Sequence, residues 1–103
     1  MYNKLMMIRL KEQQQHTIKQ LARELFNSSK VMIFGSRADE TQKGGDIDIY
    51  IQTDKKDDIL KSKLIFLREF DKLFGEQKVD LLVDNGTKKK EIFEIAKKEG
   101  IAL

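Results

Sequence analysis

Short apolar runs alternate with helical patterns along this chain of 103 residues, and the alternation limits the folds open to it. Apolar residues recur at three- and four-residue spacing in segments 12–26 and 57–74, which predicts two amphipathic helices. Apolar runs at 31–34, 47–52 and 79–83 predict three strands. Strands that alternate with helices favour one sheet covered by helices.

The connections between these segments predict the type of sheet. A long helix between the second and third strands suits a parallel crossover, whereas the short link between the first and second strands suits another geometry. Thr87 could cap a last helix from 88 to about 99, and 101–103 could add an edge strand. We therefore expect an α/β fold of the α+β type, with a small mixed sheet, helices packed on one face and a single domain over 1–103.

The helix expected over 57–74 has the clearest apolar stripe. We expect its buried side to carry Leu60, Leu64, Leu67, Phe70 and Phe74, widened by Phe66 and Leu73. Ile65 falls off this stripe, either as an ordinary exposed apolar residue or as a partner contact.

Composition excludes several classes of protein. The absence of cysteine rules out disulfides and thiolate metal sites. With 20 basic and 17 acidic residues the net charge is +3, too nearly balanced for a dedicated DNA binder. The run Lys88-Lys89-Lys90 is either a solvated face or a nucleic-acid patch whose affinity would fall steeply with salt. No apolar stretch reaches the ~20 residues of a membrane span and no export signal is evident, so we expect a cytoplasmic protein.

Strand alternation predicts a group of carboxylates. In the second strand Asp46 and Asp48 share one face with Tyr50, opposite the isoleucines. In the third strand Asp80 points away from its apolar neighbours in the same manner. If the two strands are neighbours, the three carboxylates converge.

Converging carboxylates need compensation. At ~4 Å and an effective dielectric near 20, each pair of charges costs on the order of 4 kcal/mol. Mg²⁺ removes this repulsion, because it takes a few carboxylates and fills its shell with water and substrate phosphates. Two such ions can clamp the attacking and leaving oxygens of a phosphoryl displacement.

Gly35 and Ser36 provide a possible phosphate site beside these carboxylates. They follow the first strand, and nine residues separate Ser36 from Asp46. Glycine lets a phosphate approach the backbone, and a helix that opened at Ser36 would offer free N–H groups. Either element alone is commonly just a turn or a solvated strand edge, so the combination carries the prediction.

This combination resembles the signature of the DNA polymerase β-like nucleotidyltransferase superfamily. The segments "FGSRAD" and "GGDIDIYI" resemble its minimal nucleotidyltransferase (MNT) branch, and "KVDLLV" resembles the strand that carries the third carboxylate. The resemblance runs from about Leu10 to the end of the chain.

The resemblance implies roles for the matching residues. Asp46 and Asp48 would bind two Mg²⁺ ions, and Asp80 would join the catalytic metal and help to deprotonate the attacking hydroxyl. Gly35 and Ser36 would hold the β- and γ-phosphates, while Arg37 would contact a phosphate or form a salt bridge that fixes the loop. The reaction would move a nucleoside monophosphate, AMP from ATP, onto a hydroxyl acceptor and release pyrophosphate.

The resemblance also implies a partner. Minimal members often accompany a HEPN-domain protein, and some act as antitoxins by adding AMP to a tyrosine of that protein. This short chain has little room for an acceptor-binding domain, so a second chain could supply the acceptor in a homo- or hetero-oligomer. The alternative is a catalytically silent antitoxin or binding module that keeps the fold and acts by contact.

Two further side chains have ordinary interpretations beside functional ones. His16, the single histidine, is expected on a polar helix surface, and it cannot form a histidine-based zinc site by itself. Tyr50 could stack on a base, or it could simply cover the sheet.

Overall fold

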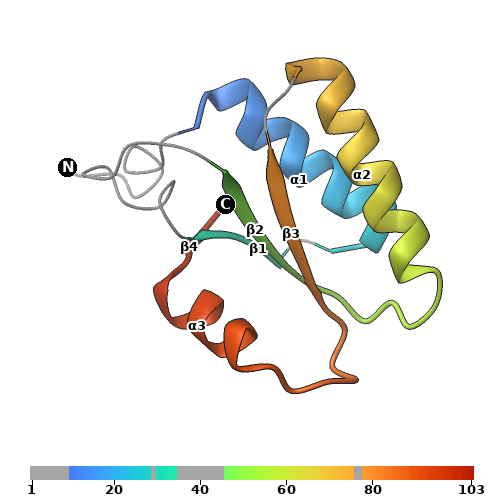
Figure 1. The fold of residues 1–103 in the computed structure, drawn as a ribbon, viewed down its shortest axis with the longest axis vertical. Coiled ribbons are helices and arrows are strands. Elements are labelled where there is room, and N and C mark those ends of the chain that lie inside the picture. The colour runs from blue at the N-terminus through green and yellow to red at the C-terminus, as the bar shows by residue number, and fades with distance from the viewer. Residues whose placement is uncertain (1–9, 29, 35–45, 76–77) are drawn as a thin grey trace.

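A computed structural model of the protein describes residues 10–28, 30–34, 46–75 and 78–103 (Figure 1). The short helix expected after Ser36 lies outside these residues. The described elements are, in chain order, α1 (Glu12–Phe26), β1 (Lys30–Phe34), β2 (Ile47–Gln52), α2 (Ile59–Phe74), β3 (Val79–Asp84), α3 (Glu91–Glu99) and β4 (Ile101–Ala102).

The sheet is mixed, as the connections predicted. Its strand order is β3-β2-β1-β4, with β1 antiparallel to both β2 and β4, and β2 parallel to β3. The parallel pair is the one joined through α2, in agreement with the expected crossover. The two-residue strand β4 pairs with Met32 and Ile33, so the possible edge strand is present.

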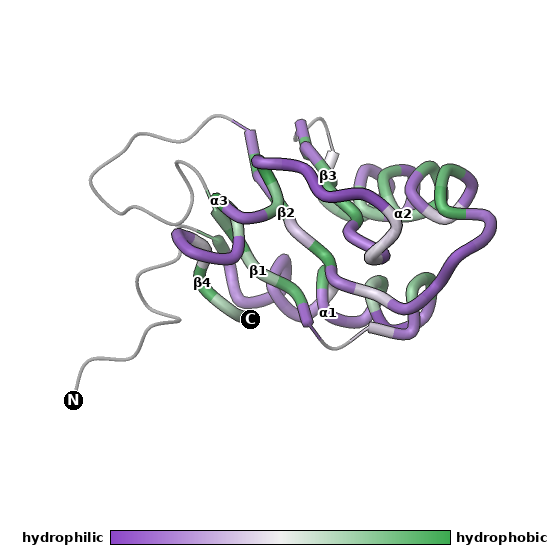
Figure 2. Tube along the Cα trace, turned by 90° about the horizontal axis from the view of Figure 1, so that it is seen from below, coloured by the Kyte–Doolittle hydropathy of each residue, from purple (hydrophilic) through white to green (hydrophobic). Residues whose placement is uncertain are grey.

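Helices α1 and α2 cover one face of the sheet. The isoleucines of β2 are fully buried there, together with Ile18 and Phe26 of α1 and Phe66 and Phe70 of α2. Figure 2 shows mainly hydrophobic residues along β1 and alternating hydrophobic and more polar residues along β2, which fits strands with a buried face. The expected one-sided layer is therefore confirmed for these two helices.

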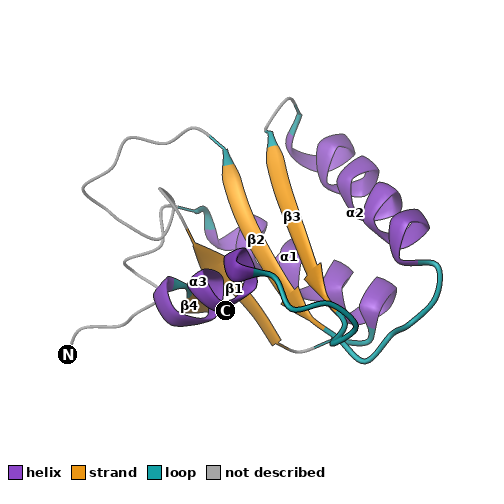
Figure 3. Cartoon of the chain, turned by 60° about the horizontal axis from the view of Figure 1, so that its bottom comes forward, coloured by secondary structure: helices purple, strands orange, loops and turns teal. Residues whose placement is uncertain are grey.

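Helix α3 lies on the opposite face, which differs from the expectation for the last helix (Figure 3). Its Phe93 and Ala96 form a second small core with Tyr50, and Met32, Phe34 and Leu82 pack around it. The physical reason is that this face of the sheet carries apolar side chains of its own, and they need a cover. Part of the second face is thereby covered, and another part carries the carboxylates described below.

The predicted stripe of α2 is partly wrong. Leu60, Leu64 and Leu73 are 69%, 58% and 64% exposed, so they are not on the buried side. The buried side instead follows Ser62, Phe66 and Phe70 at four-residue spacing, flanked by half-buried Ile59, Leu67 and Phe74. The rotation places the aromatic rings, which bury the most apolar area, against the sheet. Beside the exposed Leu60 and Leu64, a shallow hollow of about 630 Å³ is lined by Lys61, Ile65 and Arg68 as well.

Two helices end at residue types that commonly end helices, whereas the expected start of the last helix is wrong. Asn27 ends α1 in the left-handed conformation with φ 50°, and Gly75 follows α2 with φ 72°. Helix α3 begins at Glu91 rather than at residue 88, so Thr87 does not cap it. The Thr87 hydroxyl and N–H donate to Oδ1 of Asn85 and close the turn there instead. None of the described helices is long and apolar enough to cross a membrane.

Candidate active site

Asp48 and Asp80 are direct neighbours across the parallel strands β2 and β3. Asp48 lies on the face of β2 away from the isoleucine core, and Asp80 lies on the same face of β3. Asp48 is half-buried and Asp80 is exposed. Two of the three carboxylates singled out in the sequence are thus brought together by strand register alone.

The environment of Asp48 disfavours its negative charge. Burial raises the pKa of Asp48, and the charges of Asp80 and Asp46 and a side-chain hydrogen bond with Asp80 raise it further. Lys78 opposes this by lowering the pKa of the same carboxyl. The neighbouring negative charges therefore work against ionisation of Asp48, and a bound cation would relieve this repulsion.

Asp46 is held by a lysine that the sequence analysis did not single out. Nζ of Lys78 lies 3.4 Å from Oδ2 of Asp46, and the backbone N–H of Ile47 donates to the Lys78 carbonyl at 3.0 Å. Asp46 precedes β2 just as Lys78 precedes β3, so parallel pairing sets the two residues side by side. That register is the signal that could have found Lys78, but it becomes visible only once the two strands are known to be parallel neighbours.

The predicted phosphate-binding residues Gly35, Ser36 and Arg37 lie outside the described residues. Phe34, which precedes Gly35 in the chain, pairs with Asp48 across the antiparallel strands β1 and β2. Strand β1 therefore ends beside the carboxylate pair. The roles of these three residues stay predictions.

Comparison with known proteins decides the family. The family model described as "Polymerase beta, Nucleotidyltransferase" matches residues 16–103, which is most of the chain and includes both strands with carboxylates. This chain belongs to the polymerase beta nucleotidyltransferase family. A search of curated proteins finds no match. The resemblance seen in the sequence is confirmed at the level of this family.

The donor set of this nucleotidyltransferase domain suits a hard divalent cation. Within the described part of the chain, no three acidic or histidine side chains are already arranged to hold a metal ion, and Asp46 pairs with Lys78. Mg²⁺ nevertheless needs only one or two carboxylates, since water and substrate phosphates complete its shell. Asp48 and Asp80 supply two carboxylates whose mutual repulsion a cation would relieve.

Tyr50 serves the structure of the domain rather than an exposed base-binding surface. Its side chain is 1% exposed, its ring lies 5.9 Å from that of Phe93, and its hydroxyl donates to Oδ2 of Asp84 at 2.5 Å. The prediction that it covers the sheet is confirmed, and base stacking is excluded by burial. His16 is exposed on α1, as expected.

Asp84 is a buried carboxylate that the sequence analysis missed. Burial by itself would raise its pKa, but the hydrogen bonds from Tyr50 and from the Gly86 N–H and the charge of Lys97 outweigh this and lower the pKa of Asp84. The Gly86 N–H donates to Oδ1 at 3.1 Å, and Nζ of Lys97 lies 3.7 Å from Oδ2. These contacts tie the end of β3 to β2 and α3, so Asp84 has a structural role distinct from that of Asp80.

Proposed function

We propose that the protein is a Mg²⁺-dependent nucleotidyltransferase that moves AMP from ATP onto a hydroxyl acceptor. The observation that carries the proposal is the pairing of Asp48 with Asp80 on one exposed part of the sheet, in a chain of the polymerase beta nucleotidyltransferase family. A pair of like charges is costly unless a ligand uses it, and a metal–triphosphate complex is the ligand that fits these donors.

The chemistry assigns a step to each carboxylate. Asp46, Asp48 and Asp80 would hold the metal. Asp80, the neighbour of Asp48 across β2 and β3, would also help to take the proton of the acceptor hydroxyl. The acceptor oxygen bonds to the α-phosphorus while the bond from that phosphorus to the bridging oxygen breaks, and pyrophosphate leaves with the electron pair. When bound, Mg²⁺ supplies positive charge to the phosphate oxygens. Gly35, Ser36 and Arg37 are proposed to hold the β- and γ-phosphates.

The acceptor is proposed to be a tyrosine of a HEPN-domain partner, modified in an antitoxin role. This part rests on the resemblance of "FGSRAD" and "GGDIDIYI" to the minimal branch of the family. A homo- or hetero-oligomer would bring the acceptor to the site. The absence of cysteine agrees with action in a reducing cytoplasm.

The direct test is transfer of label from ATP labelled at the α-phosphate, with and without Mg²⁺, to a HEPN-domain protein and to small hydroxyl acceptors. We expect Mg²⁺-dependent transfer that Asp48→Asn and Asp80→Asn each reduce by at least about 100-fold, as losses of metal ligands or catalytic bases do. Asp71→Asn, which removes an exposed carboxylate of α2, is the matched control and should retain activity.

The silent antitoxin makes the opposite prediction. In that case an Asp46→Asn/Asp48→Asn variant, correctly folded by circular dichroism, would neutralise the partner as well as the unchanged protein does. No label would be transferred by either protein.

A further inference from the structure

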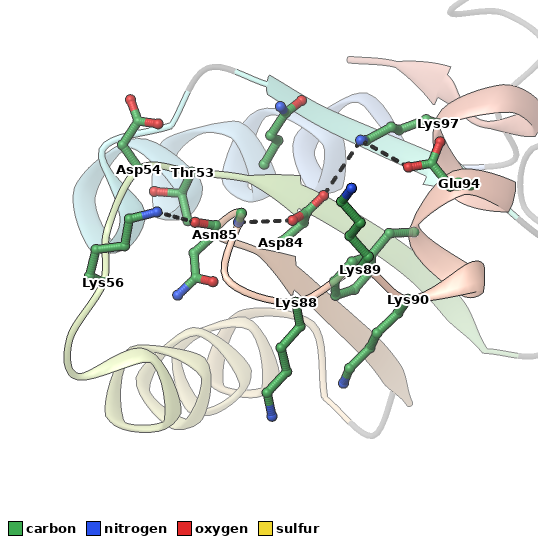
Figure 4. A pocket seen from close by; sticks show the side chains of 13 residues that line it. Thr53, Asp54, Lys56, Asp84, Asn85, Lys88, Lys89, Lys90, Glu94 and Lys97 are labelled. Carbon is green, nitrogen blue, oxygen red and sulfur yellow. Dashed lines mark hydrogen bonds and ion pairs between the residues drawn. The ribbon is translucent and has the colours of Figure 1, made fainter.

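A basic pocket lies at the end of the sheet away from the carboxylate pair. It has a volume of about 410 Å³ and combines the segments after β2 and β3 with α3 (Figure 4). We name it the lysine pocket for its five lysines, which are Lys56, Lys88, Lys89, Lys90 and Lys97. Pockets that bind small ligands fall in the range of about 300–1,000 Å³.

The lysine pocket has more positively charged than negatively charged residues in its lining. Its acidic residues are Asp54, Asp84 and Glu94. Two of them are already paired with Lys97, whose Nζ lies 3.7 Å from Asp84 and 3.4 Å from Glu94. The other four lysines therefore face a single remaining carboxylate.

The lysines differ in how far they are engaged. Lys56 donates to the Asn85 carbonyl, and Nζ of Lys90 lies 5.6 Å from the centre of the Phe93 ring. Lys88 and Lys89 are exposed and make no ion pair or hydrogen bond with any residue that the structure describes. Figure 4 shows Lys56 and Lys97 on opposite sides of the Asp84–Asn85 corner, with Lys88, Lys89 and Lys90 along a third side. Lysines of three segments thus line one hollow, with the ammonium group of Lys89 beside Asp84 and those of Lys88 and Lys90 directed away from the corner.

Hydrogen bonds fix the Asp84–Asn85 corner, around which these lysines lie. Asp84 accepts from Tyr50 and Gly86, and the backbone N–H of Thr53 donates to the Asp84 carbonyl at 2.9 Å. Ligand binding to a hollow with a fixed backbone costs less conformational entropy than binding to a segment that must first become ordered.

We propose that the lysine pocket binds a phosphate group, as a site separate from the proposed catalytic one. Asp84 lies four residues beyond Asp80 on β3, which is about 13 Å along the strand. The contact between Tyr50 and Phe93 stands between the two ends. A single phosphate group therefore does not reach both sites. The phosphate can belong to a free nucleotide or to the terminal phosphate of a nucleic-acid strand.

NMR chemical shifts of the backbone amides measure this binding directly. Inorganic phosphate, AMP and a short single-stranded oligonucleotide with or without a 5′-phosphate are titrated into the protein without Mg²⁺, at low and at physiological salt. We expect the amides of 84–90 to shift with phosphate and AMP, or with the 5′-phosphorylated strand alone if the strand end is the true ligand. Omitting Mg²⁺, and repeating the titration on Asp48→Asn/Asp80→Asn, separates this result from the proposed catalytic function.

Charge-matched variants test the assignment. Lys88→Gln/Lys89→Gln should weaken binding about tenfold or more, as loss of charge-assisted hydrogen bonds does. Lys19→Gln/Lys61→Gln removes the same charge from exposed positions of α1 and α2 and should leave binding unchanged. The proposal would be overturned if both variants lost the same binding affinity. It would also be overturned if the oligonucleotide bound equally well with and without its 5′-phosphate, or if no probe changed the amide chemical shifts of 84–90.

Discussion

The Tyr50 hydroxyl donates a 2.5 Å hydrogen bond to Oδ2 of Asp84, and both side chains are buried. Replacing Tyr50 by Phe removes the donor and leaves the carboxylate with less compensation. We expect a loss of about 1.5–3 kcal/mol in the free energy of unfolding at neutral pH, measured by urea denaturation. An unchanged free energy would mean that water replaces the hydroxyl without cost.

The same pair predicts a dependence on pH. The folded pKa of Asp84 lies below its ordinary value of 3.8, so its contribution to stability is present above that value and is lost as pH falls through the folded pKa. Tyr50→Phe removes the hydrogen bond that contributes to lowering the pKa of Asp84. The difference in unfolding free energy between the two proteins should therefore be larger at about pH 6 than at about pH 3. If the difference in unfolding free energy did not change with pH, the ionisation of Asp84 would not be its cause.

Asp48 should behave in the opposite sense. Its folded pKa is raised, so its contribution to stability is present below 3.8 and is lost as pH rises through the folded pKa. Without divalent cations, Asp48→Asn should stabilise the protein at neutral pH by about 0.5 kcal/mol, a size suited to a partly exposed group. The gain should vanish at about pH 3, where the wild-type carboxyl is protonated. Thermal unfolding across this range is the measurement.

Mg²⁺ should stabilise the folded protein through the carboxylate pair. At a concentration of 100 times the dissociation constant, binding adds about 2.7 kcal/mol to the free energy of unfolding. The rise in melting temperature should be present in wild type and in Asp71→Asn, and absent in Asp48→Asn/Asp80→Asn. An equal rise in all three proteins would assign the ion to another site.

The rotation of α2 can be tested by two truncations. Phe66 is fully buried, whereas Leu64 is 58% exposed. Phe66→Ala should cost about 3–5 kcal/mol of stability, and Leu64→Ala should stay within about 0.5 kcal/mol. If both variants lost a similar free energy of unfolding in urea, Leu64 would be buried, as the sequence pattern predicted.

Gly100 offers a prediction that depends on packing alone. A Cβ there would lie 2.5 Å from the Ala96 carbonyl oxygen and 3.1 Å from Cβ of Met32. Gly100→Ala should therefore cost about 1–3 kcal/mol, because the link between α3 and β4 would have to shift away from both the Ala96 carbonyl and Met32. Its φ of −74° is open to any residue, so Ala at this position meets a steric limit rather than a conformational one. An unchanged melting temperature would show that α3 shifts without cost.

Several features follow from the sequence alone. The alternation of Asp48 and Asp80 with apolar neighbours placed them on one face of their strands, because side chains alternate with a period of two. The end of α1 at Asn27 and the turn at Gly86, whose φ is 80°, follow from the local preferences of those residues. The length of the link between β2 and β3 was enough to expect a parallel pair.

Tertiary structure decided what local patterns leave open. Leu64 and Phe66 are both apolar and only two positions apart on α2, so only contact with α1 and the sheet could select Phe66 for the core. The pairing of Lys78 with Asp46 and of Asp84 with Tyr50 joins residues 32 and 34 positions apart in the chain. No local pattern encodes such a pair, because it exists only when strand register brings the two side chains together.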